Sequence, residues 1–161
     1  MPLMVQKECV VILHDIRSVH NAGSIFRSAD GAGVSRIILS GYTAGPIDHV
    51  GKERQDFKKV SLGSEKAVIW ERSEIPLQDK LALLKEEGYV LVALEKTAEA
   101  IDIFQFKTPQ KFVLIVGNEV DGVSAETLAV ADANIGIPMR GMKESLNVSV
   151  AAGVAFYTLL R

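Results

Sequence analysis

The feature of this sequence that most restricts its fold is a set of short, uninterrupted apolar runs distributed along the chain. A strand with one solvated face alternates apolar and polar residues, and these runs do not alternate. Uninterrupted runs of this length are typical of strands buried on both faces, as in a parallel sheet. The runs cover residues 9–13, 36–39, 89–94, 112–116 and, more briefly, 134–137. The sequence therefore predicts a parallel sheet with both faces covered.

The stretches between these runs predict the helices that cover the sheet. Pro76 opens a helix that Gly88 closes, and Ser124 is a suitable N-cap for a short helix over 124–131. Further helices are predicted over 24–32 and 145–160, a long loop over 42–59 and a short strand over 67–70. No repeat, linker or low-complexity segment interrupts this pattern. We therefore expect residues 1–161 to form one α/β domain with helices on both faces of the sheet.

The helix predicted at the end of the chain has almost no polar face. Apolar side chains follow one another around it, with Val148, Val154 and Phe156 on different sides. A helix that is apolar all round is buried all round. Either it packs on the sheet and against a second chain, or it is enclosed within the monomer. In a domain this small we favour the first arrangement, a homodimer interface.

The overall charge gives little support to a nucleic-acid partner. The chain has 18 Lys and Arg residues against 20 Asp and Glu residues, a net charge of −2, whereas an RNA-binding domain usually shows a basic excess. A local basic patch is still compatible with this sum. The densest cluster contains Lys52, Arg54, Lys58 and Lys59, interrupted by two acidic residues, and a solvated surface is its simpler interpretation.

Cysteine and histidine usage argues against disulfides and metal. Cys9 is the only cysteine and lies in an apolar run, so we expect a buried, unreactive thiol and a reducing, cytoplasmic location. The three histidines, His14, His20 and His49, do not have the spacing of a metal site. No apolar run approaches the roughly 20 residues that cross a bilayer, so we expect no membrane association.

Three segments combine glycine with polar side chains next to predicted strands, where parallel α/β sheets bind ligands. The first contains Asn21 and Arg27, the second follows the 112–116 run, and the third precedes the closing helix. Each has a simpler interpretation, since Asn21 can be a helix cap and Arg27 a solvated surface residue. The second segment lacks the Lys-Ser/Thr of a phosphate-binding loop and the glycine spacing of a dinucleotide fingerprint. The residues alone predict a ligand site but do not identify the ligand.

Taken together, the three segments resemble the ordered motifs of the SpoU/TrmH branch of the SPOUT methyltransferases. They are N-x-G-x-x-x-R from Asn21, V-G-N-E-x-x-G-V-S from Val116 and I-P-M-x-G-x-x-x-S-L-N-V-S-x-A from Ile137, and residues 61–71 are also similar. The resemblance covers nearly the whole chain. It implies S-adenosyl-L-methionine (SAM)-dependent methylation of a ribose 2′-hydroxyl of RNA, tRNA more than rRNA. It also implies a homodimer through the closing helix, and a C-terminal trefoil knot that no residue pattern alone would suggest.

The resemblance also assigns roles to particular residues. The cofactor SAM would be held by Gly117, Ile137, Leu146 and Leu94. The catalytic residues would be Arg27, Asn21, Glu119, Ser145 and Asn147. Arg27 would activate the hydroxyl in one of two ways. It could act as a transient base or, as we prefer because its guanidinium normally stays protonated, stabilise the developing alkoxide.

RNA recognition is expected from the domain itself, because the motifs fill the chain and leave no appended RNA-binding domain. The expected RNA contacts are Arg17, Lys52, Arg54, Arg140 and Lys143, which a dimer would present twice. Two alternatives stay open. One is a base-nitrogen RNA methyltransferase of the same superfamily, which the first and third motifs disfavour. The other is a non-catalytic dimer that binds SAM or RNA, which the complete set of expected catalytic residues disfavours.

Overall fold

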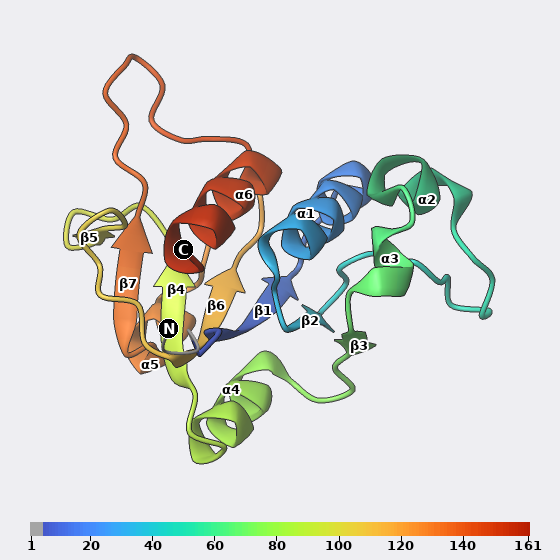
Figure 1. Ribbon diagram of the computed structural model, residues 1–161, viewed down its shortest axis with the longest axis horizontal. Coiled ribbons are helices and arrows are strands. Elements are labelled where there is room, and N and C mark those ends of the chain that lie inside the picture. Colours follow the sequence, from blue (N-terminus) through green and yellow to red (C-terminus); the bar gives the residue numbers. More distant parts are fainter. Residues whose placement is uncertain (1–4) are drawn as a thin grey trace.

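Seven parallel strands in the order β3-β2-β1-β6-β4-β7-β5 form the sheet of this protein (Figure 1). A computed structural model describes residues 5–161. The strands are β1 (Glu8–His14), β2 (Arg36–Ser40), β3 (Trp70–Arg72), β4 (Val90–Leu94), β5 (Ile101–Asp102), β6 (Lys111–Val116) and β7 (Ala133–Gly136). The helices are α1 (Val19–Ala32), α2 (Gln55–Ser61), α3 (Ser64–Ala67), α4 (Leu77–Glu86), α5 (Ala125–Val130) and α6 (Val148–Leu159). The prediction of a parallel sheet with helices on both faces is confirmed.

Successive residues of the central strands point to opposite faces of the sheet, and each face has its own apolar core. Val11 on β1 and its register partners Ile37 on β2 and Leu114 on β6 belong to the core beneath α1, α2 and α6. Val10 and Ile12 point the other way, into the core formed with the leucines of α4. Both cores are almost fully buried. This double burial explains why the strands are apolar without alternation.

Helix α1 begins earlier than the sequence pattern predicts. The predicted start at residue 24 leaves Asn21 ahead of the helix, which is wrong. The helix begins at Val19 because the Ser18 side chain accepts a hydrogen bond from the Asn21 backbone N–H. Asn21 therefore lies in the first turn, largely buried. Gly23 allows α1 and α2 to approach closely, because a Cβ there would lie only 3.2 Å from the backbone oxygen of Phe57 in α2.

The segment between β2 and α4 contains more regular structure than the sequence predicts. The predicted loop over 42–59 includes most of α2, and the predicted strand over 67–70 is wrong, because α3 ends at Ala67 and β3 begins only at Trp70. Helix α2 is held by Phe57, whose buried ring meets Phe26 of α1 edge-on at a centroid distance of 5.0 Å. The two-residue strand β5 also has no counterpart in the predicted pattern.

The order of strands in the sheet differs from their order in the chain, and this difference creates the candidate site. Strand β6 lies between β1 and β4, and β7 lies between β4 and β5. Because all these strands are parallel, the loops that follow β4, β6 and β7 leave from the same edge of the sheet. After β7 the chain forms a long loop over 137–147 before it returns as α6 beside α1 (Figure 1).

Helix α6 is apolar all round but is not buried all round within the chain. Its inner face, with Ala152 and Phe156, is buried against the sheet and α1. On its outer face, 50% of Val150 and 59% of Tyr157 are exposed. The alternative that the helix is enclosed within the monomer is therefore wrong. Within residues 5–161, no helix has the length and apolar character needed to cross a membrane.

Candidate cofactor pocket and catalytic residues

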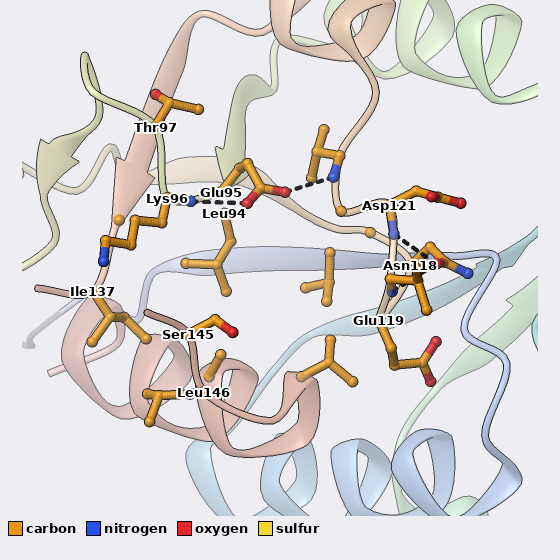
Figure 2. A pocket seen from close by; sticks show the side chains of 18 of the residues that line it. Leu94, Glu95, Lys96, Thr97, Asn118, Glu119, Asp121, Ile137, Ser145 and Leu146 are labelled. Atoms are coloured by element: carbon orange, nitrogen blue, oxygen red, sulfur yellow. Dashed lines mark hydrogen bonds between the residues drawn. The ribbon is translucent and has the colours of Figure 1, made fainter. Parts of the chain in front are cut away.

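A pocket of about 520 Å³ lies at the edge of the sheet where β4, β6 and β7 end (Figure 2). Three loops build its wall, together with the last residues of β4 and β6: residues 95–97 after β4, 117–123 after β6, and part of the 137–147 loop after β7. The start of α6 closes it through Val148 and Ala151. Its size is within the usual range for small-molecule sites, roughly 300–1,000 Å³.

The loop after β6 folds back on itself and presents backbone groups to the pocket. A Cβ at Gly117 would collide with the backbone of Gly122, and Gly122 has a φ of +66°, a conformation that favours glycine. Between them, Asn118 closes the turn because its Oδ1 accepts hydrogen bonds from the N–H groups of Val120 (2.8 Å) and Asp121 (3.0 Å). A side chain at Gly117 would clash with the returning part of the loop, and one at Gly122 would clash with the Glu95 carboxylate.

Glu95 connects the loop after β4 to the loop after β6. One carboxylate oxygen accepts the backbone N–H of Val123 at 2.7 Å and the other accepts that of Lys96 at 3.0 Å (Figure 2). The carboxylate also packs on Gly122 where a Cβ would otherwise sit. Sequence reasoning missed this residue. The available signal was its position directly after an apolar strand, next to Leu94, which was predicted to contact the cofactor.

The structure gathers the four residues that the sequence suggested for cofactor binding. Leu94, Gly117, Ile137 and Leu146 all line the pocket, although they come from three segments far apart in the chain: the end of β4, the loop after β6 and the 137–147 loop. Ser145 lines it as well, ahead of α6 rather than inside the predicted helix. The lining is a mixture of apolar side chains and backbone groups, which suits a ligand that is partly apolar and partly polar.

Beside the pocket, three of the predicted catalytic residues form a connected polar group. The Glu119 carboxylate accepts hydrogen bonds from Asn21 Nδ2 at 3.0 Å and from the N–H groups of Arg17 (2.9 Å) and Ser18 (3.1 Å). The Asn21 Oδ1 in turn accepts a bond from Asn147 Nδ2 at 3.2 Å. Asn147 also caps α6 by accepting the N–H groups of residues 149 and 150. The group thus fixes the starts of α1 and α6 relative to the β6 loop.

Glu119 is held in its ionised form. Burial opposes the charge, but the hydrogen bonds from the Arg17 N–H, the Asn21 amide and the Ser18 N–H outweigh it, so the pKa of Glu119 lies below its ordinary value. An ionised carboxylate can only accept hydrogen bonds. The Asn21 side chain is therefore oriented with its NH₂ toward Glu119 and its oxygen toward Asn147.

Arg27 is the predicted catalytic residue that neither lines the pocket nor joins the polar group beside it. It lies on the exposed side of α1, its side chain makes no hydrogen bond or ion pair with another residue of the 5–161 range, and it does not line the pocket. Glu119 contacts Asn21 on the same helix but not Arg27.

The predicted RNA-binding cations differ in their surroundings. Arg17, Lys52, Arg140 and Lys143 are exposed. Arg54 instead forms a two-point ion pair with Asp56 (3.2 and 2.9 Å), which raises the pKa of the Arg54 guanidinium. Lys58 is paired with Glu53. Two of the four positive charges of the densest basic cluster are thus balanced within the chain.

Comparison with known proteins identifies relatives of this arrangement. The chain is 36% identical to a tRNA (guanosine(18)-2′-O)-methyltransferase of Aquifex aeolicus over 156 residues. These aligned residues make up 97% of this chain and 70% of the relative. It is 33% identical to the 23S rRNA (guanosine-2′-O-)-methyltransferase RlmB of Salmonella typhi, over 94% of this chain and 59% of that protein.

Comparison of the fold with solved structures also identifies RNA methyltransferases as relatives. The crystal structure of an AdoMet-bound rRNA methyltransferase from Sinorhizobium meliloti matches 96% of this chain and 56% of its own, with a TM-score of 0.84 and 30% identity. The SpoU rRNA Methylase family matches residues 8–157, which include the whole sheet and nearly all of α6. This protein therefore belongs to the SpoU rRNA Methylase family.

Proposed function

We propose that this protein transfers a methyl group from SAM to a ribose 2′-hydroxyl of RNA, with tRNA favoured over rRNA. The observation that carries the proposal is the pocket at the ends of β4, β6 and β7, placed directly beside the Glu119–Asn21–Asn147 group. The family assignment agrees with it, as do relatives named for 2′-O-methylation of tRNA and of rRNA. The tRNA preference rests on the Aquifex relative, which is the more similar of the two.

The pocket suits SAM as the methyl donor. Gly117 and Gly122 have no side chain and let the loop after β6 fold tightly, so that backbone groups at these two positions can contact a bound molecule. Leu94, Ile137 and Leu146 supply apolar surface for an adenosine group. When bound, SAM supplies an activated methyl group on a sulfonium, a good leaving group. The AdoMet-bound relative from Sinorhizobium meliloti supports this assignment.

The residues of the chain would then orient and activate the hydroxyl. A ribose hydroxyl is a poor nucleophile at neutral pH, so the site must align it with the methyl group and assist the loss of its proton. Glu119 fixes Asn21, and Asn21 and Asn147 offer amide groups that can hold the ribose. Ser145, exposed in the pocket wall, is placed to position the same group.

Arg27 would complete this site from a second copy of the chain. The exposed apolar face of α6 lies beside α1, so a homodimer that covers α6 would also bring Arg27 to the interface. This supplies the reason why Arg27 finds no partner among residues 5–161. An arginine stays protonated at neutral pH. We therefore propose that Arg27 stabilises the alkoxide that develops on the ribose, rather than acting as its base.

We also propose that residues 8–159 form one methyltransferase domain whose C-terminal part is threaded as a trefoil knot. Strand β7 is inserted between β4 and β5, both of which precede it in the chain. The 137–147 loop then passes against the connection after β4, where Lys96 Nζ donates to the Glu144 backbone oxygen at 2.9 Å. A crystal structure traced through residues 95–147 tests the threading.

RNA would bind across the edge of the sheet that holds the pocket. Arg17 follows β1 at this edge, and Arg140 and Lys143 lie on the 137–147 loop, which also lines the pocket. Lys52 and Arg54 would extend the contact beyond α1. Since tRNA and rRNA are found there, we propose a cytoplasmic location.

The test is methyl transfer from labelled SAM to unfractionated tRNA and to rRNA, followed by nucleoside analysis, with wild type and Arg27→Ala compared. We expect a labelled 2′-O-methylnucleoside that Arg27→Ala reduces at least 100-fold while SAM binding is retained. Label on a base nitrogen would instead identify a base methyltransferase. Binding of SAM without transfer to either RNA would favour a non-catalytic dimer.

A further inference from the structure

Tyr42 is an exposed aromatic side chain that the proposed chemistry does not use. It follows β2 at the edge of the sheet that also carries the pocket, and 60% of it is exposed. An exposed tyrosine normally moves between rotamers, because nothing fixes its ring. In this protein, hydrogen bonds fix Tyr42 both at its hydroxyl and at its backbone N–H. An exposed ring that is fixed in this way indicates a function for the ring.

The hydroxyl of Tyr42 is held by Asn118, a buried residue of the loop after β6. The Asn118 side chain donates to the Tyr42 Oη at 2.7 Å and to the Asp15 backbone oxygen at 2.8 Å. Its oxygen already accepts two N–H groups of its own loop. The orientation of this amide is therefore fixed, the Tyr42 oxygen must be the acceptor, and the phenol proton is free to be donated to another molecule.

The backbone of Tyr42 is equally constrained. Its N–H donates to Asp15 Oδ1 at 3.0 Å, and Arg72 donates to the backbone oxygens of residues 41 and 43 on either side. Asp15 itself has a φ of +53°, and Gly41, packed against it, has a φ of +62°. A non-glycine residue in this conformation is strained, and such strain is found where surrounding structure fixes a functional group.

This rigid ring is next to the residues proposed to act on the ribose. Asn118 directly precedes Glu119, and Asp15 lies two residues before Arg17, whose N–H binds the Glu119 carboxylate. Exposed cations of the proposed RNA surface, Arg17 among them, share this edge of the sheet. A fixed aromatic face among cations is the combination that proteins use to hold an unstacked base of RNA.

We propose that Tyr42 is a stacking platform for a base of the RNA substrate, either that of the methylated nucleotide or its neighbour. The inference rests on the proposed RNA methylation. Stacking uses the ring, whereas bracing of the 116–123 loop would use the hydroxyl, so the two roles can be separated by substitution. The free phenol proton would add a hydrogen bond to a phosphate or sugar oxygen.

The kinetic test compares Tyr42→Phe, Tyr42→Trp and Tyr42→Leu with wild type on the RNA that accepts methyl groups. We expect Tyr42→Leu to raise the KM for RNA about 10-fold or more, with kcat and the Kd of SAM within about twofold of wild type. The two aromatic variants should retain most of the RNA affinity. Ile69→Ala, an exposed apolar truncation at the opposite end of the sheet, is the control and should leave the KM unchanged.

A second measurement does not depend on catalysis. Trp70 is the only tryptophan, so Tyr42→Trp in a Trp70→Phe background places one reporter at the proposed platform. Unfractionated tRNA should quench its fluorescence, and should not quench the same reporter placed by Ile69→Trp. If wild type methylates no RNA but quenching is seen, the proposed reaction fails and the stacking inference stands.

Three outcomes would overturn the inference. The first is a Tyr42→Leu variant that matches wild type in KM for RNA. The second is a Tyr42→Phe variant as impaired as Tyr42→Leu, or a weaker affinity for SAM in both, which would assign Tyr42 a bracing role. The third is a loss of dimer in Tyr42→Leu by light scattering, which would place the ring in a protein interface.

Discussion

At the scale of single residues, the pocket depends on one carboxylate that joins two loops. Glu95 accepts one backbone N–H from its own loop and one from Val123 in the loop after β6, and its side chain fills the space over Gly122. No other side chain of the 5–161 range accepts the Val123 N–H. The shape of the loop after β6 therefore depends on an acid that lies in a different loop.

We expect Glu95→Gln to weaken SAM binding by roughly 10- to 100-fold, because an amide NH₂ would face one of the two N–H donors, and hydrogen bonds to charged groups contribute about 1.5–3 kcal/mol. The measurement is calorimetric titration with SAM. Glu99→Gln, an exposed acid in the same connection, is the matched control. Equal SAM affinity in both variants would show that the loop keeps its shape without Glu95.

Glu119 gives a prediction about acid stability. Its pKa is lowered in the folded chain, so the ionised carboxylate stabilises the fold above the ordinary glutamate pKa of about 4.3, and this contribution is lost as the pH falls through the lowered value. We expect wild type to melt at a higher temperature than Glu119→Gln at pH 7, with a difference that shrinks below about pH 4. Thermal unfolding at several pH values checks this. Glu126→Gln, on the exposed side of α5, should show no such convergence.

At the scale of helices and strands, the sequence correctly predicted the elements that depend on neighbouring residues in the chain. The five main strands, the caps at Ser124 and Pro76, and the buried face of α6 follow from apolar runs and capping residues. Helix α2 and the start of α1 were not predicted correctly, because the first depends on the contact of Phe57 with Phe26 and the second on a cap at Ser18. Strand β5 is too short to leave a pattern.

The candidate site likewise contains features that the sequence predicted and features that it did not. Glycines and polar residues at strand ends were visible in the sequence, and the resemblance to known motifs gave them roles. The strand order that brings Leu94, Gly117 and Ile137 together is a property of the whole sheet and was not visible. Glu95 was missed because an acid after a strand has no distinctive pattern until its partner N–H groups are known.

Helix α6 carries the prediction that belongs to this scale. A charge on its outer face should prevent burial against a second chain, because an unpaired charge is costly to bury. We expect Val154→Glu to give a monomer or an unfolded chain. Tyr157→Glu should give a folded monomer, since 59% of that side chain is exposed already. Light scattering with circular dichroism distinguishes these states.

The control for α6 is Leu83→Glu on α4, which lies across the sheet and has 47% of its leucine side chain exposed. That variant should keep the oligomeric state of wild type. A folded dimer in Tyr157→Glu would mean that the chains meet through another surface, and the proposed delivery of Arg27 across the interface would fail with it.

At the scale of the whole molecule, the central strands and the pocket belong to one structure. Strand β1 lies between β2 and β6, and β6 runs directly into the loop that lines the pocket. Helices α1 and α6, which meet at the Asn21–Asn147 contact, pack on the same core as β1. A molecule bound in the pocket should therefore stabilise the sheet as a whole and not only the loops that touch it.

Cys9 on β1 allows this coupling to be measured. The thiol is 1% exposed, and burial raises its pKa to about 12, so it should react with a thiol reagent at pH 8 only when the sheet opens. We expect native labelling at least 1,000-fold slower than labelling in urea, given typical stabilities of about 5–15 kcal/mol. SAM at about 100 times its Kd should slow it a further 100-fold, because binding to the folded state alone lowers the open population by that factor.

The control is Lys59→Cys in a Cys9→Ala background, which places a thiol on the exposed side of α2. That thiol should react rapidly and at the same rate with or without SAM. If Cys9 reacts as fast as this exposed thiol, β1 is open in the native state. If Cys9 is protected but SAM does not slow its reaction, β1 opens without disturbing the pocket, and the sheet is not the single cooperative unit inferred from its shared core.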